Sequence, residues 1–158
     1  MSYEEYYTWQ EDVPGFGKAA QEKLKNCTAL VSRVGGLGGP LALSLAAAGV
    51  GRIILAHGGE LRPDDLNRQI LMTHDGLGEL RHEQAAETLR RFNPDLETES
   101  VGENISEENA ADLVGKADIN SRLPVSKRGS AAGNGQPQKC RLAMSIDGGP
   151  SVTATFDS

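Results

Sequence analysis

The stretch that decides the fold is TALVSRVGGLGGPLALSLAAAGVGRIILA, residues 28–56. It begins with a short apolar run and ends with a second one that is rich in β-branched residues, and both runs suit buried strands. Between them a glycine-rich turn leads into a Leu/Ala segment. That segment predicts a helix, with Pro40 in its first turn and Gly49 at its end. The order strand, turn, helix, strand is that of a βαβ unit, and strands this apolar on both faces predict a parallel sheet covered by helices.

The flanking segments extend this α/β pattern. We expect helices at 17–26, 82–92 and 106–114, a third strand at 96–101 and the start of a fourth at 117–119. Helical periodicity predicts the following buried side chains: Ala85, Ala86, Leu89, Phe92, Ala110, Leu113 and Val114. The fold class expected is therefore α/β, a Rossmann-like three-layer fold with a mainly parallel sheet, of which this chain carries the N-terminal half.

Apolar periodicity stops after Ile119. Residues 126–137 are small and polar, and Gly and Pro interrupt them, which is typical of a linker or a disordered segment. A doubly wound domain needs an apolar strand at this point. The sequence thus predicts a Rossmann-like half-domain at residues 1–119 and an irregular, disordered tail at residues 120–158.

Composition narrows the function. The net charge of −6 argues against a nucleic-acid-binding surface. No long apolar run predicts a membrane span, and the acidic start lacks a secretory signal, so we expect a cytoplasmic location. Cys27, expected to be buried in a strand, and Cys140 form no Cys-x-x-Cys pair. His74 and His82 lack the spacing of metal ligands and are expected to be exposed, so the sequence predicts no metal ligands.

The glycine turn, with its members Gly35, Gly36, Leu37, Gly38 and Gly39, lies between a buried strand and a helix N-terminus. The first amides of a helix lack internal partners, so such a turn can bind phosphate, and glycine lets the phosphate approach the backbone. A tight turn that only packs strand against helix is the alternative. An NAD site is disfavoured, because Arg33 replaces the first glycine of its motif and His57 replaces the acid after its second strand.

Five segments, in this order along residues 14–119, resemble the HesA/MoeB/ThiF family, the bacterial relatives of ubiquitin-activating enzymes. They are Gln21-Glu22-Lys23-Leu24-Lys25-Asn26, Gly35-Gly36-Leu37-Gly38-Gly39-Pro40, Leu45-Ala46-Ala47-Ala48-Gly49-Val50-Gly51, Asp65-Leu66-Asn67-Arg68-Gln69-Ile70-Leu71 and Arg91-Phe92-Asn93-Pro94-Asp95. The glycine turn with Arg33 and Val34, and the segment Ala56-His57-Gly58-Gly59, are most similar to the HesA branch.

The resemblance implies an ATP-dependent adenylyltransferase. Such an enzyme binds ATP with Mg²⁺ and adenylylates the C-terminal carboxylate of a small ubiquitin-like sulfur-carrier protein, with release of pyrophosphate. The carrier is thus the implied partner, and a homodimer is a further expectation. By the same resemblance the glycine turn holds the nucleotide, together with Asn67, and Arg68 contacts the phosphates.

Three further positions are implied by the resemblance with a changed residue. Arg81 stands where many members have a phosphate-contacting lysine, and Asp65 where many have asparagine. His57 replaces a ribose-binding aspartate and could donate a hydrogen bond to a hydroxyl. Arg68 and Arg81 as ordinary surface arginines, and His57 as a loop histidine, are the alternatives.

The chain also departs from the family. Trp9 aligns with an N-terminal arginine that reaches the partner's ATP in dimers, and the magnesium-holding aspartate expected after Ile119 has no counterpart. A frameshift near Ile119 or a truncated natural variant would explain the break. Two functions stay open: an adenylyltransferase, or a non-catalytic nucleotide-binding or interaction module derived from the family.

Overall fold

A four-stranded, all-parallel sheet forms the centre of the protein. The computed structural model describes residues 3–121, 140–144 and 152–156, and side chains from residue 5 to residue 121. The strands β1 (Thr28–Val31), β2 (Arg52–Ala56), β3 (Glu97–Val101) and β4 (Ile119–Ser121) lie in the order β3-β2-β1-β4. Leu30 pairs in register with Ile54 on one side and Asn120 on the other. The parallel sheet and the α/β class predicted from the sequence are confirmed.

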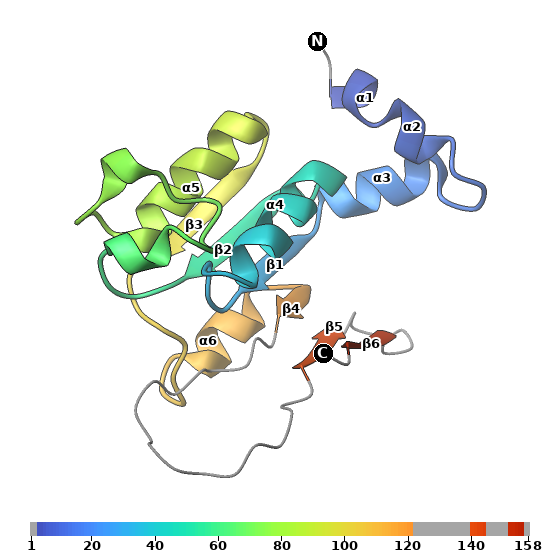
Figure 1. Cartoon of the computed structure of the whole chain (residues 1–158). Coiled ribbons are helices and arrows are strands. Elements are labelled where there is room, and N and C mark those ends of the chain that lie inside the picture. The colour runs from blue at the N-terminus through green and yellow to red at the C-terminus, as the bar shows by residue number, and fades with distance from the viewer. Residues whose placement is uncertain (1–2, 122–139, 145–151, 157–158) are drawn as a thin grey trace.

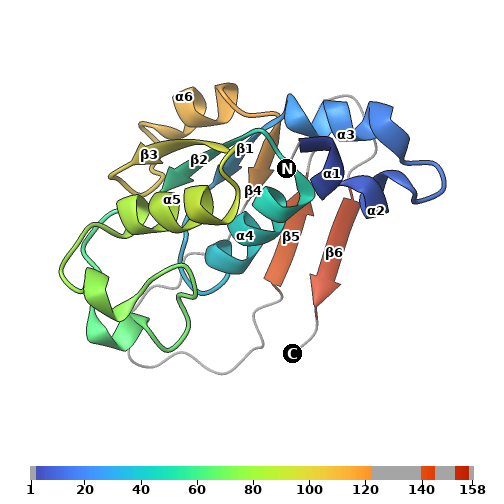
Figure 2. The same ribbon diagram turned by 90° about the horizontal axis from the view of Figure 1, so that it is seen from above.

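Helices cover both faces of this sheet, which gives three layers (Figures 1 and 2). Helices α4 (Gly38–Ala48) and α5 (Arg81–Phe92) lie on one face, and α6 (Ala110–Gly115) lies on the other. At the N-terminus α1 (Tyr3–Tyr6), α2 (Thr8–Glu11) and α3 (Gly17–Lys25) follow one another beside the sheet. Two short 3-10 turns, Pro63–Asp65 and His74–Gly76, lie in the long connection from β2 to α5.

Alternating residues of β2 show why both faces must be covered. Ile53 and Leu55 belong to the large apolar cluster under α4 and α5, whereas Ile54 and Ala56 pack with Leu113 of α6. These four residues are fully buried, and only Arg52, the first residue of β2, is exposed. A strand without a polar face is stable only between two layers. Each Å² of apolar side-chain surface left in water would lower the stability of the fold by about 25 cal/mol.

Helix α4 follows the sequence closely. It begins at Gly38 with Pro40 in its first turn, and Gly39 N–H donates to Gly35 O at 2.8 Å. It ends at Ala48, and its C-cap residue is Gly49, whose φ of 89° is left-handed and favours glycine. The small side chains of Ala42 and Ala46 are fully buried, which lets the helix approach the sheet closely.

Five expectations about helix faces, a helix boundary and Cys27 are wrong. Ala110, expected to be buried, is only partly buried. Phe92, the last residue of α5, is 51% exposed. Val114 is 45% exposed although its neighbour Leu113 is buried, so only one side of α6 packs on the sheet. Helix α6 begins at Ala110 rather than near Ser106, and Asn109, not Ser106, is its N-cap residue. Cys27 is half-buried and lies one residue before β1, and its partial burial, with the charge of Asp118, raises the thiol pKa.

The tail prediction is only partly covered by the described residues. Strand β4 runs on from Ile119 to Ser121. Further along, β5 (Cys140–Met144) and β6 (Val152–Phe156) pair antiparallel in a separate two-stranded sheet. The rest of the predicted irregular tail lies outside the described residues. Within the described part of the chain, no helix has the length and apolar character that crossing a bilayer requires.

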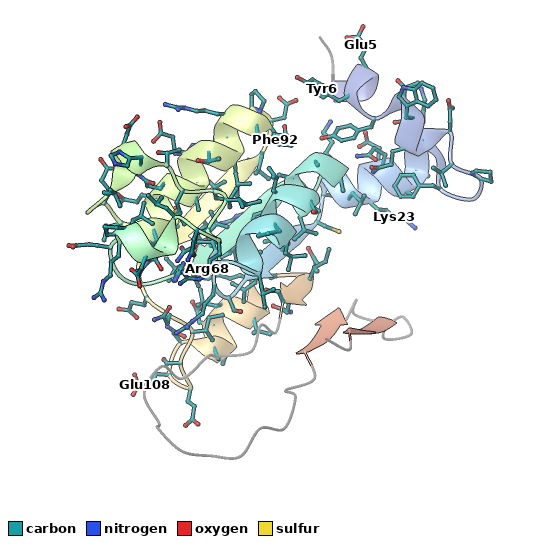
Figure 3. The ribbon with its side chains drawn as sticks, in the orientation of Figure 1. Glu5, Tyr6, Lys23, Arg68, Phe92 and Glu108 are labelled. Atoms are coloured by element: carbon teal, nitrogen blue, oxygen red, sulfur yellow. The ribbon has the colours of Figure 1, made fainter. Side chains whose placement is uncertain are left out.

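The last turn of α5 offers a matched test of this core. Leu89 is fully buried, whereas Phe92, three residues on, is 51% exposed. Figure 3 shows Phe92 at the end of α5. Leu89→Ala should lower the free energy of unfolding by about 2–5 kcal/mol, because it leaves a cavity under the helix. Phe92→Ala, the control, should cost less than about 1 kcal/mol. Urea unfolding of both variants measures the difference, and equal losses would contradict the packing of α5 on the sheet.

Candidate functional site

A polar pocket of about 310 Å³ lies at the carboxyl edge of the sheet. The residues directly after β1 and β2 and the connection from β2 to α5 form its wall. It is lined by Arg33, His57, Gly58, Arg62, Asp64, Asp65, Arg68, Gln69, Arg81 and Asn104. In open parallel α/β sheets this edge is where ligands bind, because the loops that follow the strands meet there.

Asp65 is the centre of the pocket wall. Its side chain is 5% exposed, and both carboxylate oxygens accept hydrogen bonds. Oδ1 accepts from Arg68 Nη2 at 2.9 Å, and Oδ2 accepts from Arg81 Nη2 at 2.6 Å and from Arg62 N at 3.1 Å. Burial opposes ionisation, but the hydrogen bonds from Arg81 and from the Arg62 backbone, with the two guanidinium charges, outweigh it. The pKa of Asp65 is therefore lowered, and the carboxylate is charged at neutral pH.

Arg81 is held from two sides. It is the first residue of α5, and its side chain is only 14% exposed. Besides its bonds to Asp65, Nη1 donates to Gly58 O at 3.2 Å. Gly59 makes this possible: its φ is +88°, and a Cβ there would lie 2.8 Å from Arg81 Nη1. A side chain at position 59 would therefore be strained and would also displace the guanidinium.

Arg68 lies over the glycine turn. Its Nη1 donates to Asp64 O at 2.6 Å and to Asn67 Oδ1 at 3.1 Å. A Cβ on Gly36 would meet Arg68 Cγ at 3.2 Å, so the turn and this side chain are in close contact. Figure 3 shows Arg68 at the edge where the turn before α4 meets the connection to α5. Its side chain is 40% exposed, so the guanidinium remains accessible from the pocket.

His57 is buried in the pocket as a neutral imidazole. It follows β2 directly and is 8% exposed. Burial, then the charges of Arg81 and Arg33, lowers its pKa to about 4. Its Nδ1 is buried and has no hydrogen-bond partner among the described residues. A buried polar atom of this kind is costly unless something pairs with it, so it marks a position where a ligand hydroxyl would fit.

His82 corrects the expectation that it is exposed. It is 5% exposed, and its Nδ1 lies 3.2 Å from His57 O. His57 is the first residue beyond β2, and its carbonyl can accept from the His82 ring. Burial of His82 supplies a donor for that backbone oxygen, which otherwise would remain unpaired. His74 is exposed, and the described residues contain no group of three or more His, Cys, Asp or Glu side chains that could hold a metal ion.

The structure brings most of the predicted site residues together. Gly35 faces His57, since a Cβ on it would lie 3.7 Å from His57 Cε1, and Gly36 faces Arg68. Gly38 and Gly39 are buried in the first turn of α4, whereas Leu37 is 57% exposed. Asn67 is exposed and contacts Arg68.

Sequence reasoning gave no site role to six lining residues: Arg33, Gly58, Arg62, Asp64, Gln69 and Asn104. Arg33 was recognisable in principle. It comes two residues after the buried strand β1, at the edge where the loops of parallel strands form ligand sites.

A parallel α/β sheet with a glycine turn and four arginines at its carboxyl edge defines a Rossmann-like domain with an arginine-lined pocket. The sequence profile of the ThiF family matches residues 7–120. That is well over half of the chain, and the protein therefore belongs to the ThiF family.

Known relatives agree. The chain is 54% identical over 115 residues to protein HesA of Leptolyngbya boryana, a match that covers 73% of this chain and 42% of that protein. It is 34% identical over 99 residues to the sulfur carrier protein ThiS adenylyltransferase of Escherichia coli, covering 63% of this chain and 39% of that one. The chain therefore spans less than half the length of these relatives, and its predicted likeness to the HesA branch is confirmed.

Solved structures share the fold. The crystal structure of PaaA has a TM-score of 0.68 at 27% identity, over 76% of this chain and 41% of that one. E. coli MccB, in a structure with ATP, has a TM-score of 0.61 at 29% identity, over 66% and 31% of the two chains. E. coli TcdA in complex with AMP has a TM-score of 0.66 at 25% identity, over 72% and 45%.

The buried imidazole predicts a pH dependence. His57 titrates near pH 4 in the folded protein, but its ordinary pKa is 6.5. Between these values the unfolded chain binds a proton that the folded chain does not, so stability is lost as pH falls from 6.5 towards 4, by up to about 3 kcal/mol.

NMR titration of the three imidazoles checks this, with one midpoint expected near pH 4. His57→Gln should flatten the loss of stability over this pH range, and His74→Gln, at an exposed position, should leave it unchanged. A His57 midpoint near 6.5 would contradict the burial of this imidazole in the pocket.

Proposed function

We propose that the pocket binds ATP, and that the chain carries the nucleotide-binding half of a ThiF-type adenylyltransferase. The observation that carries the proposal is the arrangement of Asp65, which holds Arg68 against the glycine turn at the N-terminus of α4 and Arg81 at the start of α5. Two guanidinium groups and the first helical amides make a strong site for phosphate oxygens. The ATP in MccB and the AMP in TcdA, both of this fold, support a nucleotide as the ligand.

Each site residue has a part in this proposal. The turn from Gly35 to Gly39 lets phosphate approach the backbone, and Arg68 and Arg81 neutralise its charge. Asp65 orients the arginines rather than contacting the anion itself, because both of its oxygens are already engaged. Asn67 supports Arg68. The unpaired Nδ1 of His57 takes a ribose hydroxyl.

The reaction needs little covalent help from the protein. The C-terminal carboxylate of a small sulfur-carrier protein attacks the α-phosphorus of ATP, a bond forms between them, and pyrophosphate leaves with the electron pair of the broken P–O bond. Positioning of the phosphates and neutralisation of the charge on the leaving pyrophosphate supply the rate. The adenylyltransferase of ThiS is a relative at 34% identity and suggests this class of partner.

Magnesium would come with the nucleotide. Mg²⁺ is usually held by one or two carboxylates together with phosphate oxygens. Asp65 does not fit that role, because its oxygens accept from Arg68 and Arg81. No step of the proposed reaction depends on a metal ligand from this chain.

A non-catalytic nucleotide-binding module is the second candidate. The match with protein HesA covers 42% of that relative, so more than half of it has no counterpart in the match. Both candidates bind ATP in the same pocket. Pyrophosphate exchange that depends on an added sulfur-carrier protein separates them: exchange supports the adenylyltransferase, and ATP binding without exchange supports the module.

Calorimetric titration of the full chain with ATP and Mg²⁺ tests the proposal. Arg68→Gln should weaken ATP binding roughly tenfold or more, because it removes a charge-assisted contact from an accessible guanidinium. Arg91→Gln is the matched control, since Arg91 is an exposed arginine that pairs with Glu87 on α5. Equal ATP affinity in both variants and the unchanged chain, or no binding to the unchanged chain, would refute the proposal.

A further inference from the structure

Arg33 is a pocket residue to which the sequence motifs give no role. It comes two residues after β1, is half-buried, and lines the pocket beside His57. Unlike Arg68 and Arg81, it makes no hydrogen bond or ion pair with any residue of the described chain. A half-buried guanidinium that no carboxylate pairs leaves part of its charge uncompensated inside a concave, polar site.

The charged side chains around the pocket leave an excess of positive charge. Its lining carries four arginines (Arg33, Arg62, Arg68 and Arg81) and two carboxylates (Asp64 and Asp65), while His57 is neutral. The pocket is therefore positive in a chain whose net charge is −6. Asp65 already engages Arg68 and Arg81, so the excess positive charge lies with the other two arginines. Arg62 is exposed to solvent, which screens its charge, whereas Arg33 is half-buried.

We propose that Arg33 is a third phosphate-contacting arginine, and that it makes the pocket selective for a polyphosphate over a monophosphate. The proposal rests on the proposed function, because it assumes that the ligand is a nucleotide. Arg68 and Arg81 are joined through Asp65 and act at one place. Arg33 approaches from the end of a different strand, and so a chain of phosphates can reach all three where a single phosphate cannot.

The neighbour of Arg33 supports a ligand in this space. The buried Nδ1 of His57 has no partner among the described residues, and its side chain is more than nine-tenths buried in the pocket wall. A nucleotide would pair with both groups, since a hydroxyl would contact the His57 imidazole and a phosphate would contact the Arg33 guanidinium. An alternative role for Arg33 is structural, in which its charge only helps to keep His57 neutral.

Titration of the full chain with ATP, AMP and inorganic tripolyphosphate distinguishes these roles. Arg33→Gln should weaken the binding of ATP and tripolyphosphate about tenfold or more and that of AMP less than about threefold, since AMP reaches fewer of the guanidinium groups. Arg33→Lys should recover part of the loss, because it keeps the charge but not the planar fork. Arg91→Gln is the control for the change in net charge.

Each outcome decides something. If Arg33→Gln weakens all three ligands equally, or none, Arg33 is structural and the inference is wrong while ATP binding stands. If the unchanged chain binds tripolyphosphate but not ATP, and Arg33→Gln abolishes that binding, Arg33 is a phosphate contact and the nucleotide function fails. If the unchanged chain binds neither, both proposals fail. Should Arg33→Gln not fold, the ratio of ATP to AMP affinity in Arg33→Lys decides, and an unchanged ratio overturns the inference.

Discussion

A buried carboxylate on which two arginines converge organises the carboxyl edge of this protein. Asp65 lies in the connection between β2 and α5, and it holds Arg68 against the glycine turn and Arg81 at the start of α5. Breaking such a buried pair by removing one partner is costly, because the other charge then remains without compensation. The same contacts thus anchor the long connection, place α5 and fix two guanidinium groups beside the pocket.

The apolar sheet beneath explains why this arrangement can be rigid. β1 and β2 are buried on both faces, and the residues that follow them have little freedom, since the strands cannot shift register without exposing apolar side chains. Gly36 then permits an approach of Arg68 that a Cβ would crowd. The core fixes the backbone, and that backbone holds the polar side chains of the pocket where solvent can reach them.

Much of the fold was predictable from the sequence, for physical reasons. The βαβ unit was predictable, because strands without a polar face and a Leu/Ala helix capped by Gly49 are compatible with few other structures. The exposure of Phe92 and Val114 and the burial of His82 were not predictable, because periodicity gives the face of a helix but not where its neighbours end. Motif resemblance located Arg68 and Arg81, yet their shared partner Asp65 and the approach of Arg33 to the same pocket depend on tertiary packing.

The most direct test of the organising role of Asp65 is the affinity of ATP for Asp65→Asn, measured by calorimetry beside the unchanged chain. Removing a negative charge from an anion site should by Coulomb's law alone strengthen binding. The convergence of two arginines on this carboxylate predicts the reverse, a loss of roughly tenfold, because an amide cannot hold Arg68 and Arg81 together as the carboxylate does. Binding that is unchanged or tighter would show that Asp65 does not organise the site.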